Sequence, residues 1–209
     1  MAGSISEHRI APPFVTWDSS LASRLQVNHL ATAQVAILLL PLLLRSASKG
    51  ATPRLVFVST ALHHISPPLK PPTDDQGILE WLNDQSKPMV SRYPVSKLLN
   101  LFFARELASR LPEDSPLVIN AVNPGFCISA LQRNVPLSRY LVFRLMEKLF
   151  SWPTERGSRQ LIFAALGNRD KSEMKGAYIS SSEIVEPSDY VISEEGARIQ
   201  KQLWVRSSR

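Results

Sequence analysis

The chain has 209 residues, a formal net charge of +6 and an apolar content of 44%, which fits one domain covering 1–209. Its positive charges form no basic run, so we expect no nucleic-acid partner. One cysteine and four histidines without zinc spacing predict neither a disulfide nor a metal site, and fit a reducing, cytoplasmic compartment.

The first predicted element is a helix from Ser20 to Ser46. Its most apolar run, "VAILLLPLLL" from Val35 to Leu44, is shorter than the roughly 18 residues that span a bilayer. We therefore predict a buried helix with a proline kink and no membrane span. The run "RLVFVST", from Arg54 to Thr60, predicts a buried central strand, and the proline-rich stretch 61–92 after it predicts a loop.

Further along the chain, helices and strands continue to alternate, which is typical of an α/β fold with a parallel sheet covered by helices. The predicted elements are a helix with one buried face over Pro94–Leu111, a strand over Leu117–Gly125, helices over Leu137–Phe150 and Glu155–Leu166, a strand over Gly176–Ser180 and a helix over Ser193–Ser208.

Four short motifs occur in one order along these elements. They are "LQVNHLAT" around Asn28, the strand end Ser59–Thr60, Tyr93 one helical turn before Lys97, and "NPG" after the next strand. Each alone has an ordinary structural explanation, such as a buried polar group, a strand end or a turn. Together they resemble the short-chain dehydrogenase/reductase family, in particular its retinol-dehydrogenase-like members and reductases of fungal secondary metabolism.

The resemblance implies a Rossmann-like fold and an NADP-dependent oxidoreductase, with NAD as the alternative cofactor, that interconverts a ketone and an alcohol on a hydrophobic small molecule. Tyr93 would be the general acid or base, and Lys97 would lower the pKa of its phenol and bind the nicotinamide ribose. Thr60, or else Ser59, would polarise the substrate oxygen, and Asn28 would support a proton-relaying water. Apolar residues of Leu137–Phe150 would contact the substrate.

The "NPGFCIS" segment would lie beside the nicotinamide through the backbone of Phe126 and Cys127 and through Ser129. Cys127 itself has no basic neighbour in the sequence, so we interpret its side chain as a small apolar filler. His63 and His64 are adjacent and would point apart on a strand, so we interpret them as loop or substrate-pocket residues rather than a metal pair.

The family's glycine-rich turn is not found in this sequence, and "MAG" at Met1–Gly3 resembles the end of a later family motif. The expected fold is therefore an N-terminally truncated Rossmann-like domain. Three explanations of the missing part remain open: a misplaced start of the gene, a genuine truncation, or a fragment that works with another chain. The alternative function is an inactive binding module. An exposed sheet edge would make the chain poorly soluble or a homo-oligomer.

Overall fold

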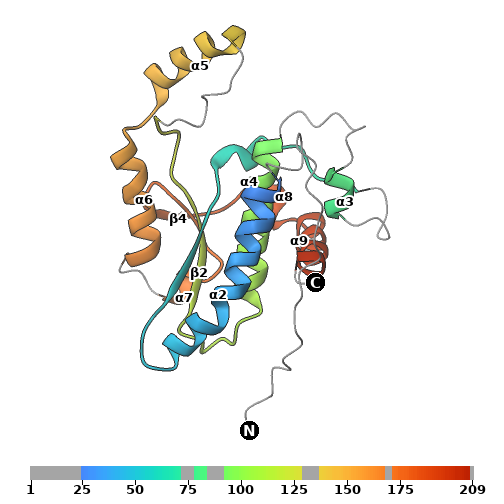
Figure 1. Cartoon of the computed structure of the whole chain (residues 1–209), viewed down its shortest axis with the longest axis vertical. Coiled ribbons are helices and arrows are strands. Elements are labelled where there is room, and N and C mark those ends of the chain that lie inside the picture. Colours follow the sequence, from blue (N-terminus) through green and yellow to red (C-terminus); the bar gives the residue numbers. More distant parts are fainter. Residues whose placement is uncertain (1–24, 72–77, 84–91, 129–136, 168–170, 208–209) are drawn as a thin grey trace.

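The computed structural model describes residues 25–71, 78–83, 92–128, 137–167 and 171–207 (Figure 1). In these ranges a small sheet is covered by helices on both faces. The elements are η1 (Gln26–Leu30), α2 (Ala31–Ala47), β1 (Arg54–Val58), η2 (Ala61–His64), α3 (Ile78–Asn83), α4 (Arg92–Ser109), β2 (Val118–Asn123), α5 (Leu137–Phe150), α6 (Thr154–Leu166), α7 (Lys171–Met174), β3 (Tyr178–Ser180), β4 (Glu183–Val185), α8 (Asp189–Ile192) and α9 (Glu194–Ser207).

The four strands follow the order β1-β2-β3-β4, with β1, β2 and β3 parallel. The predicted Rossmann-like α/β class is confirmed. The predicted parallel sheet comprises β1, β2 and β3, and β4, which the sequence analysis did not predict, folds back antiparallel onto β3. The two strands are joined by Ser181 and Ser182, which both have positive φ, at 54° and 62°. Gln160 of α6 supports this turn, since its Oε1 accepts from Ser182 N at 2.5 Å.

The two faces of the sheet pack against different helices, as the alternation of side chains along a strand requires. Ile119 and Ala121 of β2 belong to the larger core cluster with α4. Val118 and Val122 belong to a second cluster with Ala164 of α6. Figure 1 accordingly shows α6 on one side of the strands and α4 with α2 on the other.

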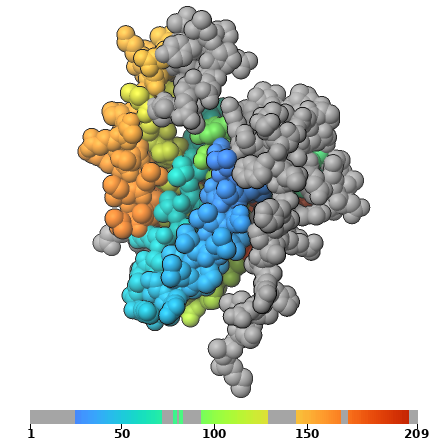
Figure 2. All heavy atoms as spheres, in the orientation of Figure 1, coloured from blue at the N-terminus to red at the C-terminus, as the bar shows by residue number. Residues whose placement is uncertain are grey.

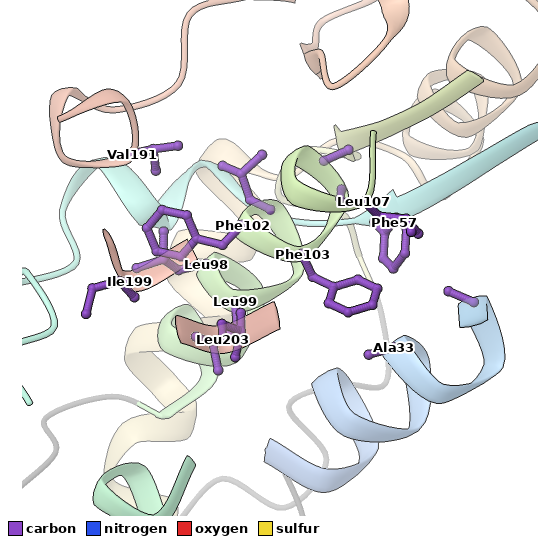
Figure 3. Close-up of a cluster of buried hydrophobic side chains, with 14 of the residues drawn as sticks. Ala33, Phe57, Leu98, Leu99, Phe102, Phe103, Leu107, Val191, Ile199 and Leu203 are labelled. Carbon is purple, nitrogen blue, oxygen red and sulfur yellow. The ribbon is translucent and has the colours of Figure 1, made fainter. Parts of the chain in front are cut away.

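Helix α4 is the centre of the fold. The prediction of one buried face is too narrow, because residues over more than half of the helix circumference are at most 1% exposed, namely Leu98, Leu99, Leu101, Phe102 and Phe103. Phe102 lies near Leu98 and Val191, whereas Phe103 points toward Phe57 of β1 and Ala33 of α2 (Figure 3). A helix enclosed by a sheet and by other helices is buried on several sides, which fixes the position of any polar group along it.

The prediction of a buried helix is wrong for α2, which lies at the surface of the described structure. Its fully buried side chains are the small ones of Ala33, Ala36 and Ala47, and Ile37, Leu40, Leu43 and Leu44 pack against the core while partly exposed. Its other large apolar residues face outward, and the most exposed are Val35 at 54%, Leu38 at 69% and Leu42 at 62%. The helix itself lies on the surface seen in Figure 2. With η1 it forms a continuous helix of 22 residues, Gln26–Ala47, that is long and apolar enough to cross a membrane by length and composition.

Strand β1 lies at an edge of the sheet, so the prediction of a central strand is wrong for the part of the chain that the structure describes. Pro53 O and Ser59 N bond to β2, at Val118 N and Val122 O. Odd-numbered residues therefore point their backbone groups at β2, and even-numbered residues such as Val56 point theirs away from it. Among the described residues no strand pairs with this outer edge of β1.

The outward apolar face of α2 should promote self-association. We expect the double variant Leu38→Gln with Leu42→Gln to shift the chain toward the monomer, because both side chains are more than half exposed and contribute little to its own core. Sedimentation velocity over a range of concentrations measures this. The matched control, Ile162→Gln with Leu166→Gln on α6, should leave the distribution of the parent unchanged. An unaltered distribution in the α2 variant would show that this face makes no contact between copies.

Candidate functional site

The candidate site lies where β1 and β2 end. The two strands are parallel and in register, with Val58 opposite Val122, so Ser59 and Thr60 follow β1 at the same edge at which Asn123 ends β2. Ligands of open α/β sheets bind at this carboxyl edge. Tyr93 and Lys97 lie in the first turns of α4, and Lys97 reaches this edge, since its Nζ donates to Val58 O at 3.2 Å.

Lys97 and Tyr93 lie on one face of α4, as i and i+4 residues do, and both are half-buried. The Lys97 Nζ lies 6.0 Å from the centroid of the Tyr93 ring. Burial raises the pKa of the Tyr93 phenol and lowers the pKa of the Lys97 ammonium. Desolvation thus opposes the expected lowering of the Tyr93 pKa by Lys97 and the cofactor, and that lowering stays a prediction.

The two hydroxyls after β1 have different surroundings. Ser59 is 2% exposed, and its Oγ donates to Lys97 O at 3.0 Å, which joins β1 to α4. Thr60 is partly exposed and begins η2, where its Oγ1 accepts weakly from Leu62 N at 3.4 Å. An accepting hydroxyl still has its own hydrogen to donate, so Thr60 is better placed than Ser59 to contact a ligand.

Asn28 lies on η1, which packs against α4. Its Nδ2 donates to Ser96 Oγ at 3.1 Å, and Ser96 Oγ in turn donates to Tyr93 O at 2.8 Å. These bonds attach η1 to the first turn of α4, next to the tyrosine. The predicted relay through a water is not addressed by these contacts, and the role of Asn28 in it stays a prediction.

Two residues that the sequence analysis missed complete this network. Asn100 Nδ2 donates to Asn28 O at 2.9 Å and, at 3.4 Å, to Val58 O, the same carbonyl that Lys97 contacts. Asn100 Oδ1 lies 3.0 Å from Nδ1 of buried His29, and because this amide oxygen can only accept, His29 donates from Nδ1. Tyr93, Lys97 and Asn100 follow i, i+4, i+7 spacing, a pattern that could have indicated Asn100.

The turn after β2 begins with an Asx-type contact, in which Asn123 Oδ1 accepts from Gly125 N at 3.1 Å. Gly125 has a φ of 83°, and a Cβ there would lie 2.9 Å from the Trp152 ring, so glycine is required on both grounds. Phe126 is 38% exposed, and its carbonyl accepts from Trp152 N at 2.7 Å.

Cys127 is held by contacts that fit a structural side chain. Its Sγ lies 3.3 Å from Pro124 O, and a Cβ at Gly157 of α6 would lie only 2.3 Å from that sulfur. Helix α6 thus packs directly onto the turn. Ser129, the remaining predicted cofactor-binding residue, lies outside the described residues.

The interpretation of the two histidines is corrected. They lie on the short helix η2 rather than a strand, with ring centroids 4.2 Å apart, so they do not point apart. His63 is 1% exposed and its Nδ1 donates to Thr60 O at 2.6 Å, which makes it a support for the Thr60 backbone. In the described part of the chain no group of three or more histidine, cysteine or acidic side chains could hold a metal ion.

Similarity to known proteins is found at the level of individual relatives, whereas no protein-family model matches the chain. A short chain dehydrogenase of Arthrobotrys oligospora is 33% identical over 86% of this chain and 55% of its own length. The short-chain dehydrogenase anuD of Penicillium roqueforti is 34% identical over 90% and 50%. The short chain dehydrogenase/reductase dmxR8 of a Cryptosporiopsis species is 33% identical over 96% and 61%.

A solved structure, that of an uncharacterized protein from Mycobacterium Paratuberculosis, matches with a TM-score of 0.58 and 25% identity. The match covers 88% of this chain and 57% of that protein. The chain therefore spans about half to three fifths of the length of the proteins that it matches.

The buried His29 should make the stability of the fold depend on pH. Burial lowers its pKa from 6.5 to about 4, so the unfolded chain binds this proton more readily than the folded chain. The stability is then intact above about pH 6.5 and falls by up to about 3 kcal/mol as the pH approaches 4. We expect His29→Gln, which keeps a donor for Asn100, to lose less stability than the parent over this interval.

Urea unfolding of both proteins at pH 7 and pH 4.5 measures the difference. His63, whose pKa burial also lowers, should leave a residual pH dependence in the variant. An equal loss of stability in parent and variant would show that His29 does not titrate as a buried group.

Proposed function

We propose that this chain is an NADP-dependent oxidoreductase. The premise is that it belongs to the short-chain dehydrogenase/reductase family, over the part of the family's length that it spans. It would interconvert a ketone and an alcohol on a hydrophobic small molecule. The observation that carries the proposal is the placement of Tyr93 and Lys97 at the carboxyl edge of the sheet, beside the hydroxyl-bearing residues that end β1.

Tyr93 would donate a proton to the substrate oxygen. Because burial raises the pKa of its phenol, the hydroxyl is protonated at neutral pH, the form that a general acid requires. Thr60 would donate a hydrogen bond to the same oxygen as negative charge develops on it. These protonation states support reduction of a ketone at neutral pH, and oxidation of an alcohol at higher pH.

The donors of Lys97 fit the nicotinamide ribose. An ammonium group has three N–H donors, and the hydrogen bond from Lys97 Nζ to Val58 O leaves two of them for ribose hydroxyls. The backbone of Phe126 and Cys127, and Ser129, would lie beside the nicotinamide ring. A bound nicotinamide cofactor would supply or accept the hydride. The choice of NADP over NAD follows the tendency of the family.

A hydrophobic substrate is supported by the apolar surface near the turn after β2. Phe126 and Ile128 are 38% and 51% exposed there. The second half of α5 also presents apolar side chains, namely Leu145, Met146, Leu149 and Phe150, which are 45–67% exposed. A role in secondary metabolism follows from the resemblance of the sequence motifs to reductases of fungal secondary metabolism. We place the protein in the cytoplasm, as a homo-oligomer without a nucleic-acid partner and without a membrane span.

Tyr93→Phe tests the general acid. The variant loses only the hydroxyl, so we expect ketone-dependent NADPH oxidation to fall by about 10²- to 10⁴-fold while the fold is kept. The matched control is Tyr190→Phe, whose hydroxyl bonds to Leu69 N and O in the core, and which should keep the parent rate per folded molecule. A Tyr93→Phe variant with half the parent rate would refute the role of Tyr93.

Lys97 should limit the rate at alkaline pH. Because burial lowers its pKa, the ammonium loses its charge at a lower pH than an exposed lysine would, and the rate of reduction should fall as the pH rises through that range. Arginine keeps its charge over this range, so Lys97→Arg should move the fall to higher pH even if its maximal rate is lower. The pH profile of kcat, normalised to its maximum, measures this. Coincident profiles would assign the alkaline fall to another group.

A further inference from the structure

A polar cavity lies away from the candidate site, near the amino-terminal end of β3. It has a volume of about 330 Å³ and is lined by Arg105, Ala108 and Ser109 of α4, Lys175 and Gly176 before β3, and Gln200 of α9. Lys175 and Gly176 precede β3, whereas the candidate site follows β1 and β2. Arg105 lies eight residues after Lys97 on α4, which corresponds to about 12 Å along the helix axis.

Small side chains leave this cavity open. Gly176 has a φ of 70°, and a Cβ there would meet Ala108 Cβ at 3.6 Å, so the two residues let the segment before β3 approach α4 closely. Two cationic side chains, those of Arg105 and Lys175, line the same cavity. Its volume is at the lower end of the range of small-molecule sites.

Among the residues that line this cavity, Arg105 gives the clearest indication of the kind of ligand. Its Nε is buried and, within the described residues, has no hydrogen-bond partner. None of the ion pairs found in that part of the chain involves Arg105. Burial lowers the pKa of its guanidinium, although arginine stays charged at any ordinary pH. A half-buried charge without a partner is costly, which indicates a position made for an anion.

The neighbouring acidic residue does not neutralise Arg105. Glu106 directs its Oε1 to Arg110, at 2.6 Å from Nη2, and its Oε2 to Gln200 Nε2, at 2.7 Å. Lys175 Nζ donates to the backbone carbonyl of Glu113 at 2.5 Å, so its charge is bound to a neutral group. Two positive charges in the cavity are therefore without an acidic partner among the described residues.

We propose that this cavity is a binding site for a small oxyanion, a phosphate or carboxylate group, held by Arg105 and Lys175. The planar guanidinium offers a fork of N–H donors that fits two oxygens of such a group, and the ammonium supplies the second charge. Ser109 and Gln200 line the same space and would contact the remainder of the ligand. The site is separate from the proposed redox site and does not depend on its activity.

Isothermal titration of the whole chain with inorganic phosphate, at constant ionic strength set by sodium chloride, tests the proposal directly. We expect a Kd of about 1 mM or tighter, and a rise in Tm of about 3 °C or more at ten times the Kd. Acetate is titrated in parallel, and the tighter of the two anions identifies the group that the site prefers. Failure of both anions to bind above the chloride background would overturn the proposal.

Variants then assign the site. Arg105→Met keeps the length of the side chain and removes its charge, so phosphate or acetate should bind at least about tenfold more weakly. Lys175→Gln should also weaken binding. Arg159→Met, at an exposed arginine on α6 that is 69% accessible, should bind as the parent does. Equal affinity in the parent and in Lys175→Gln would overturn the assignment, even if Arg105→Met failed to fold. Equal affinity in the parent and in a folded Arg105→Met would overturn it as well.

Discussion

The side chain of Asn100 is the constraint on which the candidate site depends. From one position on α4 it bonds to Asn28 O on η1, to Val58 O at the end of β1 and to His29. These are segments from distant parts of the sequence, and each carries or adjoins a candidate residue. A single amide can hold all three only because α4 is buried, so that water does not compete for its donors. Lys97 shares the Val58 carbonyl and is positioned by the same contact.

Much of this fold could be predicted from the sequence, because these features depend on residues that are near one another in the sequence. Helix α5 begins and ends where the apolar pattern places it, and the turn signature Asn123–Gly125 ends β2 as expected. The i, i+4 spacing of Tyr93 and Lys97 likewise determines that they share a helical face. Strand β4, with three residues, is too short for any periodicity to show.

What the sequence could not reveal depends on contacts between distant segments. The burial of α2 and the central position of β1 were inferred from their apolar residues, but both properties depend on what packs beside them. The pairing of His29 with Asn100 joins residues 71 positions apart, and no local pattern contains it. The raised pKa of Tyr93 is a consequence of burial, which spacing alone does not specify.

The hairpin between β3 and β4 is connected through α6 to the turn at Cys127, although the two lie far apart in the sequence. Ser181 and Ser182 adopt left-handed backbone conformations that cost roughly 1–2 kcal/mol each for residues other than glycine. Gln160 offsets part of this cost by accepting from Ser182 N and Oγ, and thereby ties the hairpin to α6. One turn earlier on α6, Gly157 packs against the Cys127 sulfur. Helix α6 is thus a rigid spacer between a strained hairpin and the segment expected beside the nicotinamide. Relaxing that hairpin would alter how firmly this segment is held, without changing any residue that touches a ligand.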